Sequence, residues 1–360
     1  MSKATQVVSW LLVMSGLAAM CYRARQTSQT PRMTLLTYHR IGEAGLAGDF
    51  GDPQMISASP AGFEWQIAHV RRYFTVLSLG EIIERFQAGS PLPLNIAVIT
   101  FDDGYQDNYS LAYPILRRYG LPATIFLTTG LIDDANGSGK GTTDAMWWDE
   151  LVFLLATTQT GTVSVPDLGV LNLSTAKDRS RAREKLRRHL KSLDNDDRRM
   201  QVDALKHSLA SEQNAQLRTP ARLTWEEVCE MSRNGVTFGA HTHSHPILTR
   251  VSNDEAEREI LLSKRIIENK LGTPVRLFAY PNGKKGDFDA RIQEILIQSG
   301  FDAAVTLVHG SNRLIKNQLD WYALRRIHVS NDDRRTFIAK VSGALEMFAS
   351  GLPSLRQQEY

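Results

Sequence analysis

Two short clusters of carboxylate and imidazole side chains could carry chemistry in this chain. The first is the adjacent pair Asp102 and Asp103, and the second is the segment 241–246 (HTHSHP), which holds three histidines. Imidazole is the commonest protein ligand for zinc, and it also suits cobalt and nickel. His241 and His245 are four residues apart, so a helical turn would put both rings on one face. A carboxylate from the first cluster would complete a metal site of two histidines and one aspartate.

Both clusters directly follow apolar runs that are typical of buried parallel strands, 96–101 (IAVITF) and 236–240 (VTFGA). In α/β folds, chemistry collects where such strands end at their carboxyl side. Neighbouring side chains on an extended chain point in opposite directions, so Asp102 and Asp103 could take different roles unless the turn at Gly104 brings them together. The simpler alternatives are that Asp103 only caps the next helix, and that the histidines only hydrogen-bond within a polar loop.

Strand and helix patterns alternate along most of the chain. After a first strand at 33–39, further apolar strands are expected at 123–127, 275–280, 303–307 and 324–329, with helical spacing between them. This alternation predicts an α/β fold of repeated βα units. Residues from about 150 to 225 depart from this alternation of strands and helices, with a hairpin pattern at 161–173 followed by a highly charged helical stretch. We interpret this region as an α-rich insertion.

A long apolar run, residues 7–22, lies near the N-terminus between Lys3 and the pair Arg23 and Arg25. A spanning helix needs about 20 apolar residues, so the run is short, and no good signal-peptide cleavage site follows it. We expect residues 1–30 to form an apolar helix that anchors the protein to a bacterial membrane or docks on the main domain. If the helix spans, its arginines favour a cytoplasmic main domain, but the sequence does not fix the side of the membrane.

The bulk composition is that of an ordinary globular protein. Of 360 residues, 42% are hydrophobic and 22% are charged, which allows a sizeable core. The net charge of +3 is too small to indicate a nucleic-acid partner. The two cysteines, Cys21 and Cys229, support neither a disulfide framework nor a thiolate metal site.

The two clusters together resemble a known family. TFDDGY at 100–105 and HTHSHP at 241–246 are similar to the motifs of the polysaccharide deacetylases, the family 4 carbohydrate esterases related to chitooligosaccharide deacetylases. LTYHRIGE at 36–43 and FAYPNG at 278–283 resemble a bacterial branch that modifies exopolysaccharides and other surface glycans. The resemblance implies a distorted (β/α) barrel of about seven strands, here over residues 31–350.

The resemblance also implies roles for the charged residues. Asp103, His241 and His245 would bind a divalent metal, most commonly Zn²⁺ with Co²⁺ or Ni²⁺ as alternatives, and Asp102 would be the general base. Many members steady that base with an arginine just before a proline turn. This chain has Ala279-Tyr280 at that place, which is a departure from the pattern.

The remaining candidates follow from the chemistry of amide hydrolysis. The tetrahedral oxyanion needs a backbone N–H, which the turn at Asn282 could supply. In the family a late histidine protonates the leaving amine, and His328 is the candidate here besides His309. The predicted substrate-binding residues are His39, Tyr280, Pro281 and Trp148.

Three functions are compatible with these residues. The first is metal-dependent hydrolysis of acetamide groups on an N-acetylated polysaccharide or oligosaccharide. The second is O-deacetylation of an acetylated glycan, and the third is an inactive glycan-binding module. The presence of Asp102 and of every presumed metal ligand favours an enzyme.

Overall fold

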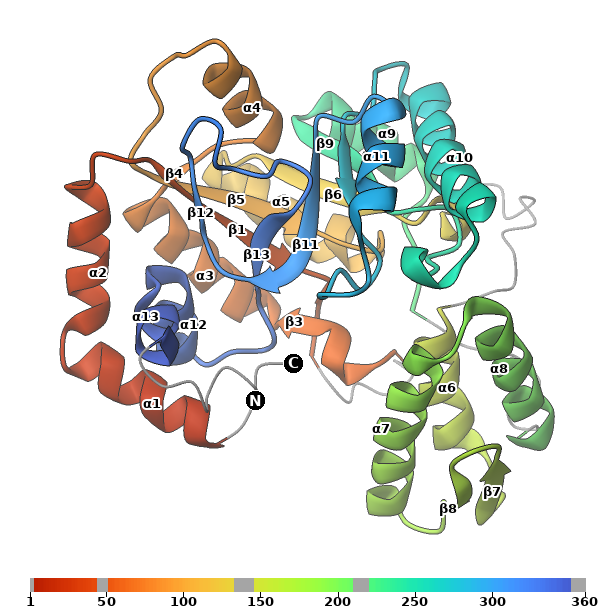
Figure 1. Ribbon diagram of the computed structural model, residues 1–360. Helices are drawn as coiled ribbons and strands as arrows, with labels where there is room; N and C mark the ends of the chain where they lie inside the picture. The colour runs from red at the N-terminus through yellow and green to blue at the C-terminus, as the bar shows by residue number, and fades with distance from the viewer. Residues whose placement is uncertain (1–2, 44–50, 133–145, 210–219, 351–360) are drawn as a thin grey trace.

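A closed ring of parallel strands organises the computed structural model, which describes residues 3–43, 51–132, 146–209 and 220–350 (Figure 1). The ring consists of β1 (Arg32–Tyr38), β5 (Asn95–Phe101), β6 (Ala123–Leu127), β9 (Val236–Ala240), β10 (Leu277–Ala279), β11 (Ala303–His309) and β13 (Leu324–His328). Each strand pairs with the next in this order, and β1 closes the ring by pairing with both β5 and β13. The pairing of β11 with β13 shifts register, and β9 meets β10 at a single residue pair. The predicted distorted (β/α) barrel of about seven strands is confirmed.

Helices pack around the outside of the barrel. They are α3 (Pro60–Tyr73), α4 (Leu79–Gln87), α5 (Tyr113–Tyr119), α9 (Trp225–Arg233), α10 (Asn253–Leu271) and α11 (Ala290–Gln298). Serine, threonine or aspartate side chains accept a backbone N–H at the starts of α3, α4, α9, α10 and α11, which satisfies donors that a helix leaves unpaired. Thr224 and Glu227 form a capping box at the start of α9.

Short elements extend the barrel at its edges. They are β2 (Arg40–Ile41), β3 (Ile56–Ala58), β4 (Thr75–Val76), β12 (Asn312–Arg313), the 3₁₀ turns η1 (Pro53–Met55), η3 (Thr129–Leu131) and η5 (Leu248–Arg250), and a π-helical turn η2 (Asn108–Ala112). β4 pairs with the start of β5, β12 pairs antiparallel with β1, and β2 pairs with β3. The segment through η1 and β3 supplies residues to the cavity described below.

The two-residue period of the strands divides the apolar side chains into two cores. Met33, Leu35, Ile96, Val98 and Val305 belong to a core inside the barrel. The intervening strand residues, such as Leu36, Ile99 and Phe278, belong to a second core beneath the outer helices. This alternation of side chains continues past the strand ends. Residues that follow a strand in step with its inward-facing side chains therefore reach the opening of the barrel at the carboxyl ends of the strands.

The predicted insertion forms a small unit with its own core, and it lies below the barrel in Figure 1. Its elements are α6 (Trp147–Thr157), the hairpin β7 (Thr162–Val165) and β8 (Gly169–Asn172), α7 (Ala176–Ser192) and α8 (Asn195–Leu209). Leu154, Leu171, Leu186 and Leu205 are among the residues buried in this core. Residues 210–219 of the predicted insertion lie outside the described residues.

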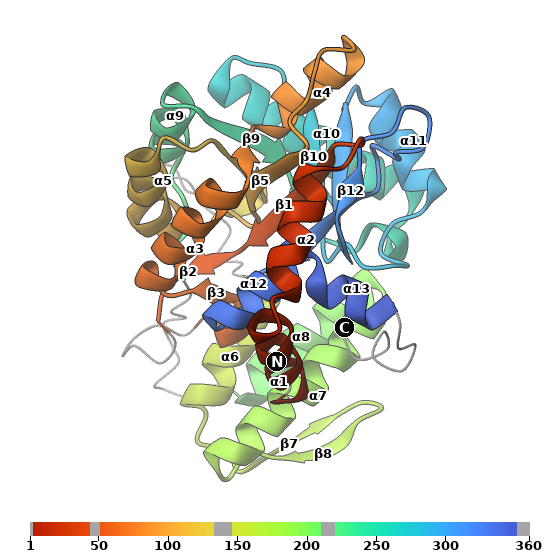
Figure 2. The ribbon, with the colours of Figure 1, turned by 90° about the vertical axis from the view of Figure 1, so that its left-hand side faces the viewer.

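The N-terminal apolar segment is two helices rather than the single helix that the sequence predicts. α1 (Lys3–Met14) and α2 (Leu17–Gln26) meet at Gly16, whose positive φ of 79° breaks the helix. Figure 2 shows the pair beside α12 (Arg334–Ser342) and α13 (Ala344–Ser350). Within the described residues no single helix is long and apolar enough to cross a membrane, although α1 and α2 together meet that test with a bend of 64° between them.

Candidate metal centre and active site

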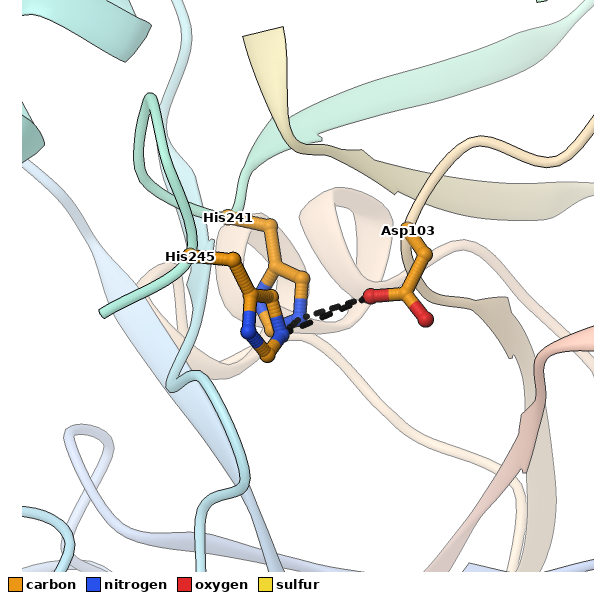
Figure 3. A group of neighbouring side chains, drawn as sticks. All are labelled: Asp103, His241 and His245. Carbon is orange, nitrogen blue, oxygen red and sulfur yellow. Dashed lines mark hydrogen bonds and ion pairs between the residues drawn. The ribbon is translucent and has the colours of Figure 1, made fainter. Parts of the chain in front are cut away.

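Asp103, His241 and His245 converge at the carboxyl ends of β5 and β9 (Figure 3). The Asp103 Oδ1 atom lies 3.5 Å from the Nε2 atom of each histidine, and the two Nε2 atoms are 3.1 Å apart. All three side chains are buried, and one ligand atom from each lies within 4.8 Å of the others. The structure therefore brings together the three residues predicted as ligands.

Unusual backbone angles direct these side chains inward. Asp103 and His245 have positive φ values of 74° and 61°, which L-residues adopt at a cost. The Thr242 hydroxyl accepts the backbone N–H of His245. The Glu259 carboxylate accepts the backbone N–H of His243 at 2.9 Å, and the His243 ring pairs with Thr129. His243, the third histidine of the motif, therefore helps to hold the loop in place and is not one of the three predicted ligands.

The donor set fits a divalent cation. The His241 Nδ1 atom lies 2.7 Å from the carbonyl oxygen of Ala279, so Nδ1 carries the proton and the Nε2 lone pair faces Asp103. Burial and the neighbouring His241 lower the pKa of His245 to about 3, which keeps that ring neutral. Burial raises the pKa of Asp103, but its contact with His241 and the nearby rings of His245 and His39 outweigh burial, so the pKa is lowered. Two imidazoles and a carboxylate are an ordinary zinc ligand set.

Asp102 has a partner that the sequence analysis missed, Arg326 on β13. The Arg326 guanidinium donates from Nη1 and Nη2 to the two oxygens of Asp102, at 2.8 and 2.7 Å, and its Nε donates to the carbonyl oxygen of Thr306. Both side chains are fully buried. Burial alone raises the pKa of Asp102, but Arg326 outweighs it and the pKa is lowered. Asp102 is therefore an ionised carboxylate beside the ligand triad.

A cavity of about 640 Å³ opens above the triad, and Asp102, Asp103, His241 and His245 all line it. Four other predicted residues also line it: His39, Trp148, Asn282 and His328. The rings of His39 and His328 lie 5.5 Å apart between centroids, edge to face. Burial, followed by His39 and Lys340, lowers the pKa of His328 well below its ordinary value, so this ring is neutral near pH 7.

The polysaccharide deacetylase family model matches residues 90–304, which is more than half of the chain. The chain belongs to the polysaccharide deacetylase family. This membership confirms the resemblance noted in the sequence. The matched range includes both motifs and the whole insertion but ends before β13.

Two solved structures share the fold at low sequence identity. The Streptococcus pyogenes deacetylase PplD, solved in complex with acetate, is 19% identical with a TM-score of 0.56, over 87% of this chain and 99% of that one. IcaB from Ammonifex degensii is 17% identical with a TM-score of 0.54, over 87% of this chain and 98% of that one.

One relative is similar in sequence over a shorter stretch. A poly-β-1,6-N-acetyl-D-glucosamine N-deacetylase of Staphylococcus aureus is 32% identical over 109 residues, which are 28% of this chain and 37% of that protein. The chain spans about half or less of the length of the curated relatives it matches, from 12% to 51%.

Two residues predicted to bind substrate lie away from the cavity. Tyr280 is fully buried in the outer core, its hydroxyl donates to the carbonyl oxygen of Tyr322, and its ring stacks on Phe288. The physical reason is the strand period, because Ala279 faces the barrel interior and the next side chain must face outward. Pro281 is buried and does not line the cavity. The structure does not bring these two side chains to the cavity, whereas Asn282 on the same turn does line it.

Trp148 joins the insertion to the active site. Its ring lies 5.0 Å from that of His245 between centroids, and its Nε1 donates to the hydroxyl of Tyr105. That hydroxyl donates to Asp149, which also accepts from Arg222. The insertion is thus fastened to the turn after β5 by a buried polar network, which fixes the position of one cavity wall.

Arg326 is expected to stabilise the fold as well as the base. Replacing Arg326 with Met should lower the free energy of unfolding by about 3–5 kcal/mol, because it leaves the Asp102 carboxylate buried without its partner. Since the pKa of Asp102 is lowered in the folded protein, the pair stabilises the fold above the unfolded-state pKa and is lost as the pH falls through the folded-state value. Urea unfolding at several pH values measures this effect.

The neighbouring Arg325 provides a matched control on the same strand. Its side chain is exposed, so Arg325→Met removes the same charge without uncovering a buried carboxylate. A loss of stability as large in the Arg325 variant as in the Arg326 variant would contradict the assignment.

Proposed function

We propose that this protein is a metal-dependent hydrolase that removes acetyl groups from the amino sugars of an N-acetylated polysaccharide or oligosaccharide. The observation that carries the proposal is the Asp103, His241 and His245 group beside the Asp102–Arg326 pair in one cavity. A metal-ligand set next to an uncoordinated carboxylate matches what amide hydrolysis needs.

In this proposal Asp103, His241 and His245 hold the divalent ion, with Zn²⁺ as the first choice and Co²⁺ or Ni²⁺ as alternatives. A bound ion would polarise the acetyl carbonyl and acidify a water molecule. The Ala279 carbonyl accepts the Nδ1 proton of His241, which fixes the direction of its Nε2 lone pair, and the Trp148 ring packs edge to face against His245.

Asp102 is the proposed proton acceptor for the attacking water. Arg326 keeps its carboxylate ionised and fixes its orientation with two hydrogen bonds, so the base is ready before substrate arrives. The same pairing lowers its basicity, which a neighbouring Lewis acid offsets by making the water a stronger acid.

Asn282 and His328 are proposed for the two remaining tasks. Asn282 lines the cavity with its backbone in the left-handed region, φ 60°, and its N–H is proposed to donate to the oxyanion. His328 lines the cavity and is proposed to pass a proton to the leaving amine. Because its ring is neutral near pH 7, it must first take up a proton during the reaction.

The proposed substrate is a surface glycan rich in N-acetylglucosamine. Support comes from relatives named for poly-β-1,6-N-acetyl-D-glucosamine and from the cavity volume, which lies in the usual range for ligand sites. The test is acetate release by the purified metal-loaded protein from poly-β-1,6-N-acetylglucosamine, chitotetraose and acetylated xylan. Release from the amide substrates supports the proposal. Release from xylan alone would make the protein an O-deacetylase, and sugar binding with no release would make it a glycan-binding module.

We also propose that α1 attaches the protein to the surface of a bacterial membrane. Val7, Trp10, Leu11 and Met14 are spaced along one side of α1 and are between 44% and 63% exposed. The opposite side packs on α12 and α13. Arg334 and Arg335 border this apolar stripe, which suits anionic lipid headgroups.

The stripe can be tested without deleting the helix. Replacing Trp10 and Leu11 with Ser should reduce co-sedimentation with vesicles containing anionic lipid by about tenfold or more, since each buried apolar side chain contributes about 1.5–3 kcal/mol. Substituting the exposed Val170 on the insertion by Ser is the control. Equal binding by both variants would refute the proposal. Deleting residues 1–30 is a poorer test, because Tyr22 packs in the outer core and Arg25 donates to Thr34.

A further inference from the structure

Three basic side chains gather on one wall of the active-site cavity. Arg187 and Lys191 come from α7 of the insertion, and Lys284 comes from the loop that follows Asn282. Arg187 and Lys191 are four residues apart, so they lie on one face of α7. The other face, with Leu186 and Leu190, is buried in the core of the insertion. The helix thus turns its basic face to the cavity.

The surroundings of Lys191 disfavour its charged form. Burial lowers the pKa of Lys191 to about 8, and the nearby charges of Arg187 and Lys284 add to the effect, while Asp287 and Asp52 only partly compensate. The charge of Lys191 also contributes to the lowered pKa of His245, so the wall is within electrostatic reach of the metal ligands. A site that holds like charges close together favours a ligand of the opposite charge.

Three carboxylates, Glu184, Asp52 and Asp287, lie near this wall, and of these only Asp52 lines the cavity. Within the described residues Lys191 makes no ion pair shorter than 4.0 Å. The Arg187 guanidinium lies 3.5 Å from Glu184, but its Nε is buried without a hydrogen-bond partner. Asp52 also lines the cavity, and one of its oxygens accepts the backbone N–H of Gln54.

The carboxylates at the bottom of the cavity are already engaged. Asp102 is paired with Arg326, and Asp103 belongs to the ligand triad. The fourth basic residue in the lining, Lys340, is paired with Asp332 and does not add to the wall. Among the described residues that line the cavity near α7, three are basic and one, Asp52, is acidic.

We infer that Arg187, Lys191 and Lys284 form a subsite for an anionic group of the glycan, a carboxylate or a phosphate close to the acetamide that is cleaved. This inference rests on the proposed function and narrows its substrate class to acidic N-acetylated glycans. Arginine can bind either oxyanion with two parallel hydrogen bonds, and lysine adds point charges. The insertion, which the barrel does not need for its own closure, then serves to select substrate.

The experiment compares three N-acetylated oligosaccharides of similar length. Chitotetraose is neutral, a hyaluronan tetrasaccharide carries carboxylates, and an oligomer of N-acetylglucosamine 1-phosphate carries phosphodiesters. Wild type should show a kcat/KM for acetate release at least about tenfold higher on one acidic substrate than on chitotetraose, with the difference shrinking at high salt. The acidic substrate with the higher kcat/KM identifies the anionic group.

The double variant Arg187→Gln/Lys191→Gln should lose that preference through a raised KM, with activity on chitotetraose kept within about twofold. Lys185→Gln is the control, because it removes a charge from the same helix at an exposed position outside the cavity. If wild type prefers chitotetraose, or if the double variant loses activity equally on all three substrates, the subsite does not exist.

A separate binding measurement distinguishes failure of the subsite from failure of the proposed function. If no substrate releases acetate, the deacetylase proposal fails. Calorimetric titration of hyaluronan tetrasaccharide into wild type and the double variant then still tests the subsite. Tighter binding by wild type supports it, and equal binding overturns it.

Discussion

Asp102→Asn is expected to lower kcat by about 10²–10⁴-fold while leaving the metal content unchanged, because the amide cannot accept the proton of the attacking water. Asp102 lies outside the ligand triad and is held by Arg326, so its loss removes a base and not a ligand. Acetate release and metal analysis on the same preparation measure the two effects. Turnover close to that of wild type would mean that the reaction needs no protein base.

The pH dependence gives an independent check on the same residue. Because Arg326 outweighs burial and lowers the pKa of Asp102, this carboxylate is already ionised at mildly acidic pH. Any rise of kcat/KM between about pH 5 and pH 7 should therefore come from another group. Arg326→Met should raise the pKa of Asp102. If the pH profile of kcat/KM is unchanged in that variant, the ionisation of Asp102 does not cause the fall in activity at acidic pH.

Loss of a ligand is expected to be more severe than loss of the base. His241→Ala or Asp103→Asn should reduce both bound metal and acetate release to a small fraction of wild type, since three protein ligands are few and each is required. The measurement is metal content after dialysis against a weak chelator, followed by activity with and without added Zn²⁺. Full metal content in either variant would show that the triad is not the metal site.

His243→Ala is the matched control for the histidine motif. The His243 ring points away from the triad and pairs with Thr129, while its backbone N–H is held by Glu259. The variant should keep its metal. Loss of metal in His243→Ala alone would mean that the ligands have been assigned wrongly.

The sequence was sufficient for the elements and for the centre of the site because both depend on local patterns. Apolar runs gave β5, β6 and β9 to within a residue or two, and a charged or imidazole residue followed two of them directly. The predicted N-terminal apolar segment is helical, but it is divided into α1 and α2 because Gly16 adopts a left-handed conformation that hydropathy does not register.

Arg326 was missed because it becomes a partner of Asp102 only when the barrel closes. Two arginines stand side by side on β13, and only the two-residue period decides which of them faces inward with Leu324 and His328. The same period places Tyr280 outside, although it adjoins a cavity residue in sequence. Following the two-residue alternation along the buried strands and past their ends would have pointed to Arg326 and would have placed Tyr280 outside the barrel.

The position of β1 has a consequence for how the chain acquires its fold during synthesis. β1 is made first, yet it pairs with β13, near the other end of the chain, and the bond between Asp102 and Arg326 spans 224 residues. Until β13 emerges, the Asp102 carboxylate has no counter-charge, and the edges of β1 and β11 that β13 will join are unpaired. Contacts this distant slow folding and leave exposed strand edges open to aggregation. Arg326, which orients the base, thus lies on the last strand to complete the barrel. A nascent or truncated chain that lacks β13 should therefore depend on chaperones and have no organised active site.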